Sequence, residues 1–244
     1  MALPEGWTPR RMKLSILERV AAEPRQRNAK SNLVGRSATD RGTLERALGL
    51  TFTDEQRASV YQLVQDLCRG GFFSPSFGQL GGGEDWVVLT DPGRNAIERR
   101  ALDELDEALL RISEELVEVR EGMWAALLSG RADSLRQAAH SARELISQVI
   151  DALAPEDRVR AATWFRPHPD VRNGVTRAHR VRLVLENRGR GEGDRDLIDN
   201  LCEQVNLNYG RLSGQAHGRA QPDPADVRDL LELVELILRR LLCR

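Results

Sequence analysis

The chain has 244 residues, of which 41% are hydrophobic and 30% are charged, so it is long enough to bury a core in one large domain or two small ones. No stretch approaches the roughly 20 apolar residues of a membrane helix, and the first residues lack the order of a signal peptide, so we expect a soluble, cytoplasmic protein without a membrane partner. A net charge of −1 excludes a uniformly basic protein that coats nucleic acid.

The first hundred residues predict helices, then a hairpin, then another helix. We expect helices at 10–22, 43–50 and 53–69, strands at 72–77 and 86–89 joined through the glycines at 81–83, and a helix that starts at Asp91-Pro92 with the acid as its cap. Thr53 and Gln56 have the spacing of a capping box, and Gly70-Gly71 ends that helix. No helix or strand is predicted for the basic segment 25–41.

This order of elements resembles a winged helix-turn-helix module. The stretch Trp86-Val-Val-Leu-Thr-Asp-Pro-Gly-Arg-Asn-Ala-Ile97 resembles the junction between the wing and the last helix of bacterial members. The resemblance implies that residues 1–92 bind nucleic acid, DNA or RNA, with helix 53–69 in the major groove. Protein interaction or dimerisation is the alternative role. The predicted outward positions of that helix include Gln56, Arg57, Ser59 and Gln62, and Arg10, Arg11 and Lys13 are predicted phosphate contacts within the basic first 36 residues.

The second half of the chain predicts a helical bundle. Apolar residues from Leu102 to Met123 repeat in heptads, which predicts one unbroken helix from Pro92 to about 128, with 93–129 as a connecting segment. We expect further helices at 135–153, 175–187, 194–208 and 224–243, a hairpin of the first two long helices, and an exposed loop at 187–194. The fold class is thus mainly α: a winged helix joined by a long helix to a bundle at 130–244.

The last helix is strongly apolar, with Asp223 as its cap. Ten of its residues are Val, Leu or Ile, too many for one face of a bundle helix. Together with the heptad seam, this excess predicts a homodimer.

The segment Tyr209-Gly-Arg-Leu-Ser-Gly-Gln-Ala-His-Gly-Arg219 carries the candidate chemistry. An arginine and a histidine beside one phosphate can support RNA cleavage without metal, because imidazole transfers protons and guanidinium stabilises the charged phosphorane. On an unbroken helix, Arg211 and His217 lie about 120° apart and do not converge. Convergence requires a break at Gly214, where glycines disfavour a helix, or a second copy of the segment.

The spacing of Arg211 and His217 resembles the signature of HEPN-type ribonucleases, which form their active site across a dimer interface. Together with Gln137-Ala-Ala-His-Ser-Ala-Arg-Glu-Leu-Ile146 and Val175-Thr-Arg-Ala-His-Arg-Val-Arg182, it resembles predicted nucleases associated with prokaryotic PIWI modules in defence loci. The resemblance implies that Arg211 and His217 are catalytic, that Arg143 and Arg177 bind phosphate, and that a defence-system protein is a partner. Arg180 and Arg182 form either a phosphate surface or a solvated basic face.

These patterns lead to two hypotheses. The first is a nucleic-acid-binding defence or toxin-like protein whose helical domain binds RNA and acts as a metal-independent ribonuclease; the alternative is a dimeric winged-helix transcription regulator whose helical domain only dimerises or binds an effector. The histidines and cysteines show no metal-ligand spacing, and we expect neither a metal nor a cofactor.

Overall fold

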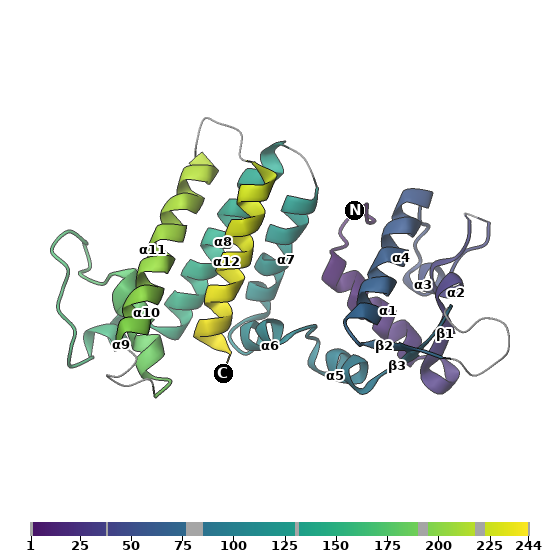
Figure 1. Cartoon of the computed structure of the whole chain (residues 1–244), viewed down its shortest axis with the longest axis horizontal. Helices are drawn as coiled ribbons and strands as arrows, with labels where there is room; N and C mark the ends of the chain where they lie inside the picture. Colours follow the sequence, from purple (N-terminus) through teal and green to yellow (C-terminus); the bar gives the residue numbers. More distant parts are fainter. Residues whose placement is uncertain are drawn as a thin grey trace. The chain divides into compact units, whose positions relative to one another are not determined.

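The computed structural model describes residues 2–37, 39–76, 85–129, 132–189, 195–217 and 223–243. The chain divides into two compact units, Met1–Asp103 and Glu104–Arg244. Both are built mainly from helices, as predicted, and the first also holds a small sheet (Figure 1). The boundary falls inside the segment 93–129 that we expected to connect the units.

The first unit has the predicted order of helices, hairpin and final helix. Its elements are α1 (Pro9–Ala21), a 3-10 turn (Pro24–Gln26), β1 (Arg27–Ala29), α2 (Lys30–Val34), α3 (Thr43–Leu48), α4 (Asp54–Arg69), β2 (Phe73–Pro75), β3 (Trp86–Leu89) and α5 (Asp91–Arg99). The turn, β1 and α2 lie in the basic segment for which no element was expected.

The sheet has three strands in the order β1-β3-β2, and both pairs are antiparallel. Phe73 pairs with Leu89, which confirms the predicted hairpin, whereas residues 77–84, with the predicted strand end at 77 and the glycines of the tip, lie outside the described residues. Arg27 pairs with Val88 on the other side of β3. The hairpin therefore gains a third strand from a distant part of the chain, and three or more strands make such a sheet stable.

Local capping explains where the helices of this unit begin. Thr53 accepts from the N–H of Gln56 at 3.2 Å, and the Gln56 side chain accepts from the N–H of Thr53 at 2.9 Å, which confirms the capping box. The cap of α5 is Thr90, whose hydroxyl accepts from the N–H of Gly93, so the expected cap at Asp91 is wrong. Asp91 is instead the first helical residue, where its charge suits the helix dipole.

The predicted unbroken helix from Pro92 to about 128 is wrong. The chain forms three helices there, α5, α6 (Glu104–Leu110) and α7 (Glu114–Leu128). Arg100 adopts a left-handed conformation with φ of 52°, which ends α5. Ser113 caps the start of α7, because its side chain accepts from the N–H of Glu115. The heptad spacing wrongly predicted one helix because its apolar residues belong to two different hydrophobic cores. Leu102 packs in the core of the first unit, and Leu105 is buried in the core of the second.

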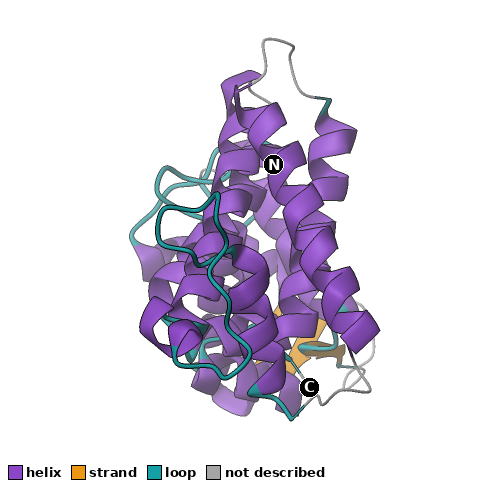
Figure 2. Cartoon of the chain, turned by 90° about the vertical axis from the view of Figure 1, so that its left-hand side faces the viewer, coloured by secondary structure: helices purple, strands orange, loops and turns teal. Residues whose placement is uncertain are grey.

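The second unit is a helical bundle around α8 (Figure 2). After α6 and α7 it contains α8 (Ala132–Leu153), α9 (Glu156–Arg160), α10 (Arg177–Glu186), α11 (Arg195–His217) and α12 (Pro224–Leu242). The apolar face of α8 is buried against α7, α10, α11 and α12, and the α7–α8 hairpin is confirmed. No helix in the described part of the chain has both the length and the apolar content that crossing a bilayer requires.

The apolar excess of α12, on which the predicted homodimer partly rested, is accounted for within one chain, and the homodimer itself stays a prediction. Leu231, Val234 and Leu238 are fully buried within a single chain, because α12 packs against α6, α7, α8 and α11. Asp223 caps the helix as predicted, by accepting from the N–H of Ala225 at 2.8 Å. A central helix has several buried faces, and this explains its composition without a partner.

The helix α11 is longer than predicted. It continues past Asn208 and remains helical through Gly210 and Gly214 to His217, so the first of the two routes to convergence, a break at Gly214, is excluded. In Figure 1, α11 ends and α12 begins at the end of the bundle where α7 ends and α8 begins. The candidate pair Arg211 and His217 therefore lies near this end, which we call the α11 end.

Candidate functional site

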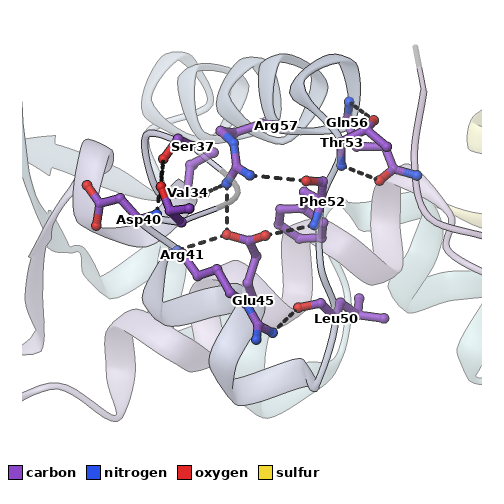
Figure 3. A network of polar contacts seen from close by, with 12 residues as sticks. Val34, Ser37, Asp40, Arg41, Glu45, Leu50, Phe52, Thr53, Gln56 and Arg57 are labelled. Carbon is purple, nitrogen blue, oxygen red and sulfur yellow. Dashed lines mark hydrogen bonds and ion pairs between the residues drawn. The ribbon is translucent and has the colours of Figure 1, made fainter.

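Arg57, a predicted nucleic-acid contact of α4, is a structural residue. Only 7% of it is exposed, and its guanidinium donates to the carbonyl oxygens of Val34 (2.9 Å) and Phe52 (3.1 Å) and to Glu45 (2.8 Å). Figure 3 shows these contacts converging between α3 and α4. The outward orientation expected for Arg57 is wrong, because Arg57 shares the buried face of α4 with Val60 and Val64.

Glu45 is the centre of this buried network. Its carboxylate is fully buried and accepts from the N–H groups of Phe52 (2.7 Å) and Gly42 (2.9 Å) in addition to Arg57. Burial raises the pKa of Glu45, but the hydrogen bonds from Phe52, Arg57 and Gly42 outweigh it and hold the pKa below its ordinary value. A side chain at Gly42 would lie 2.2 Å from the carbonyl oxygen of Leu33, so this loop needs glycine.

The other predicted contacts of α4 have mixed surroundings. Gln56 forms the capping box, the half-buried Ser59 accepts from the N–H of Ala2, and the exposed Gln62 donates to Asp66 at 3.2 Å. Of the four, only Gln62 is both exposed and free of a contact to the backbone in the described residues.

The three cations of α1 remain at the surface with local partners. Arg10 donates to the carbonyl oxygen of Arg100, Arg11 lies 4.6 Å from the ring centre of Trp7, and Lys13 is 3.7 Å from Asp66. Such exposed pairs are weak, so a phosphate can compete for these side chains.

In α10, the predicted basic residues hold the bundle together. Arg180 donates to the carbonyl oxygen of Ala154 and pairs with Asp151 at 3.2 Å, and Arg182 lies 4.3 Å from the ring centre of Trp164. His179 completes a capping box with Thr176. Burial first, and then the positive charges of His168 and Arg182, lower the pKa of His179. Arg177, the first residue of α10, is half-buried.

Arg211 is exposed on α11 and makes no hydrogen bond or ion pair with a described residue. The side chain of His217 lies outside the described residues, but its backbone belongs to the helix. Because the helix is unbroken, the two positions lie about 120° apart around its axis. One copy of α11 therefore does not bring both side chains onto one phosphate.

Helix α8 carries a histidine and an arginine that are in contact and that were not predicted as a pair from the sequence. Arg143 donates to Nδ1 of the exposed His140 at 3.1 Å and to Glu144 at 3.1 Å. We call His140, Arg143 and Glu144 the α8 cluster. The spacing of three and four residues places all three on one helix face, and this is the signal that could have identified them.

Helix α10 contacts one end of both α8 and α11. Arg180 binds Asp151 of α8, and the Ala178 carbonyl oxygen lies 3.7 Å from Sγ of Cys202 in α11. Arg211 follows Cys202 by nine residues, so it lies about 180° from Cys202 around the helix axis and faces away from α10. Arg177, Arg180 and Arg182 remain at the α10 level, away from Arg211.

Possible metal ligands and thiols occur among the described residues. Within the described ranges, no group of three or more His, Cys, Asp or Glu side chains could hold a metal ion. Burial, and secondarily the charge of Asp199, raises the pKa of the Cys202 thiol to about 11, so this thiol is a poor nucleophile at neutral pH.

The second unit is similar to a family of known proteins, and this similarity places the chain in the class of predicted nucleases. The model of one family, described as predicted pPIWI-associating nuclease, matches residues 109–241. The chain belongs to this family, which confirms the predicted resemblance to PIWI-associated nucleases for this unit. Neither the curated proteins nor the solved structures gave a match. Membership implies a nucleic-acid substrate, and the family description indicates an association with PIWI-type proteins of prokaryotes.

Proposed function

We propose that the helical unit is a metal-independent ribonuclease of prokaryotic defence in which Arg211 and His217 act on one scissile phosphate. The family match over this unit supports nuclease activity. The exposed Arg211, six residues before His217 on an unbroken helix, is the observation that carries the assignment of the site.

We further propose that two copies of α11 complete the site. Leu207 is 60% exposed, and a Cβ added at Gly210 would meet no described atom within 4 Å, so this face is open and carries an exposed leucine. By helix geometry, Leu207, Gly210 and Gly214 lie between Arg211 and His217 around the axis. A second α11 packed on this face would be flanked by Arg211 on one side and His217 on the other, and glycines allow such close approach.

The chemistry follows from these two groups. The ribose 2′-oxygen attacks phosphorus, so that an O2′–P bond forms and the P–O5′ bond breaks. Imidazole accepts the proton of the 2′-hydroxyl, and an imidazolium or water protonates the leaving O5′. Arg211 stabilises the charge that develops on the phosphoryl oxygens. The products are a 2′,3′-cyclic phosphate and a 5′-hydroxyl.

Mixing two inactive variants tests the shared site. Arg211→Ala and His217→Ala proteins should each be inactive on single-stranded RNA in the presence of EDTA. After the two are unfolded and refolded together, about a quarter of wild-type activity should return, because half of the dimers are mixed and each has one intact site. Products with 2′,3′-cyclic phosphate ends are the readout. Refolding of each variant alone is the control, and no recovery in the mixture would contradict a site shared between copies.

For the first unit, we propose a winged helix that binds nucleic acid. The β2–β3 hairpin after α4 and the cations of α1 support this role. The alternative of a noncatalytic transcription regulator gains no support from membership in a nuclease family.

The cations of α1 should contribute through phosphates. Replacing Arg11 with glutamine should weaken binding to many sequences and reduce the slope of log K against log salt by roughly one unit, because one fewer counterion is released. Gln62→Ala should change the preference among duplexes and leave that slope unchanged. Titrations at several salt concentrations measure both. If neither change has an effect, nucleic acid is not the partner of this unit.

A further inference from the structure

Residues 161–182, which form the loop between α9 and α10 and most of α10, are strongly basic (Figure 1). They contain five arginines against a single carboxylate, that of Asp170, in a chain whose net charge is −1. Two adjacent aromatic residues, Trp164 and Phe165, lie in the same loop, and both are half-buried. Cations interleaved with aromatic rings are typical of surfaces that bind single-stranded nucleic acid, because phosphates pair with cations and bases stack on flat groups.

Trp164, Arg182 and Glu186 form one fixed group, which we call the Trp164 platform. The guanidinium of Arg182 lies over the Trp164 ring, 4.3 Å from the ring centre. The carboxylate of Glu186 accepts from Nε of Arg182 at 3.0 Å and from the indole N–H of Trp164. One carboxylate therefore holds both flat groups in place, so little side-chain entropy is lost when a ligand binds to them.

A cluster of rings attaches the loop to α10. The ring of His179 on α10 lies 5.2 Å from the Phe165 ring, in an edge-to-face arrangement, and 6.2 Å from the Trp164 ring. Gly174 closes the loop with φ of 70°, and a Cβ there would lie 2.9 Å from Cβ of Pro167, so this position needs glycine. The platform is thus part of a loop with a defined conformation.

Arg182 forms the outer surface of the platform. Its side chain is 42% exposed although it packs on Trp164 and pairs with Glu186. A guanidinium is flat and remains charged, and unpaired nucleobases stack on guanidinium planes as they do on aromatic rings. The bases of a duplex are covered by their neighbours in the stack. The geometry of Arg182 therefore suits a single strand.

A second cation lies next to the platform. Arg166 is exposed, and its Nη1 donates to the carbonyl oxygens of Phe165 (2.7 Å) and Thr163 (3.4 Å), the residues on either side of Trp164 in the chain. Its guanidinium is therefore held against the backbone that carries the indole. Its Nε and Nη2 make no hydrogen bond with a described residue, so they can donate to a phosphate oxygen.

We propose that the Trp164 platform binds an unpaired nucleobase, which stacks on Arg182, while Arg166 binds a phosphate of the same strand. The choice of a nucleic acid as the ligand rests on the proposed nuclease function. The platform lies apart from the candidate catalytic residue Arg211, which faces away from α10. It holds a nucleotide outside the scissile linkage and makes the unit prefer unpaired strands to duplexes.

The experiment uses the full-length protein and fluorescent 2′-O-methyl oligonucleotides, which lack the free 2′-hydroxyl that the proposed reaction requires. Arg182→Lys keeps the charge and removes the flat guanidinium. It should raise the dissociation constant for a single strand of mixed sequence about tenfold, within the usual contribution of one stacked base. Arg228→Lys, which changes an exposed arginine of α12, is the matched control and should bind like wild type.

An abasic strand of the same length tests whether a base is the group that Arg182 contacts. Abasic spacers keep every phosphate and remove every base, so wild type should bind this strand more weakly, and Arg182→Lys should weaken that binding no further. Arg166→Ala should weaken binding to both strands by a similar factor, because both carry phosphates. An equal loss for Arg182→Lys on both strands, or no loss on the intact strand, would overturn the proposal.

A duplex of the same sequence distinguishes lost stacking from a distorted loop. Wild type and Arg182→Lys should bind the duplex equally, because its bases are already stacked on one another. A distorted loop would instead weaken binding to the duplex, the intact strand and the abasic strand alike, and this result would count against the platform.

Cleavage assays separate this inference from the proposed function. If wild type cleaves no RNA but its preference for the intact strand over the abasic strand is lost in Arg182→Lys, the nuclease proposal fails and the platform stands. If wild type cleaves RNA and Arg182→Lys neither binds more weakly nor raises KM, the platform is refuted and the nuclease proposal stands. Equal affinity of wild type for the intact and abasic strands would also refute the platform and favour an acidic protein as the partner of this loop.

Discussion

Replacing Glu45 with alanine should destabilise the first unit by about 3–5 kcal/mol, because it removes one partner of a buried ion pair. The substitution leaves Arg57 buried without its carboxylate and takes the acceptor from the N–H groups of Gly42 and Phe52. Since a domain is stable by about 5–15 kcal/mol, a large part of the stability of this unit is lost.

Hydrogen exchange read by mass spectrometry can assign this loss to one unit. Peptides from α3 and α4 should lose protection in Glu45→Ala, and peptides from α8 should keep it, because the two units have separate cores. Glu55→Ala is the matched control, since Glu55 is exposed on α4. Equal protection of α3 and α4 in wild type and Glu45→Ala would show that the network contributes little.

The lowered pKa of Glu45 also predicts the pH dependence of this stability. A carboxyl group whose pKa is lower in the folded state contributes stability above its unfolded pKa of about 4.3. This contribution is lost as the pH falls through the folded pKa, so wild type should weaken below about pH 4.3 more steeply than Glu45→Gln. Unfolding midpoints measured between pH 3 and pH 7 test the difference.

The sequence predicted the elements that local signals determine. The capping box of Thr53 and Gln56, the hairpin at Phe73 and Trp86, and the apolar face of α8 all depend on residues close together in the chain, and all were confirmed. The strand β1 was missed because it has only three residues and depends on pairing with β3, sixty residues away.

The wrong predictions have a common physical cause: contacts with residues distant in the chain determine the structure at these positions. Arg57 was expected outward as a charged residue, but Glu45 compensates its burial. Glycines at 210 and 214 left a break or a close approach open, and the helix continues because packing of α11 on α8 and α10 outweighs a cost of about 1 kcal/mol for each glycine. The heptads of 102–123 are periodic, but the break at Ser113 divides them between α6 and α7, and Leu102 precedes α6.

The candidate site was predicted only in part for the same reason. The spacing of Arg211 and His217 was visible in the chain, whereas the α8 cluster depends on a hydrogen bond between His140 and Arg143 and on the antiparallel packing of α8 on α11. Sequence spacing alone gives no sign of which nitrogen of His140 faces Arg143. Which helix faces meet is a tertiary property.

His217→Ala should reduce the rate of RNA cleavage by about 10²–10⁴-fold, the usual contribution of a positioned acid or base, and should leave RNA binding within a few-fold of wild type. Because His217 is the proposed proton-transfer group, the pH profile of the residual activity should differ from that of the wild type. Arg211→Ala should reduce both binding and cleavage, because guanidinium contacts the phosphate before and during the reaction.

The control for this prediction is His168→Ala. His168 has a side chain that is 47% exposed, in the segment between α9 and α10, away from the α11 end, so its replacement should leave cleavage unchanged. Rates are measured on single-stranded RNA in EDTA, with circular dichroism to verify that each variant is folded. A trace of contaminating ribonuclease would cleave RNA equally in wild type, His168→Ala and His217→Ala. Cleavage by this protein should fall in His217→Ala and not in His168→Ala. Full activity of folded His217→Ala would therefore remove His217 from the site and, with it, the ribonuclease mechanism proposed for α11.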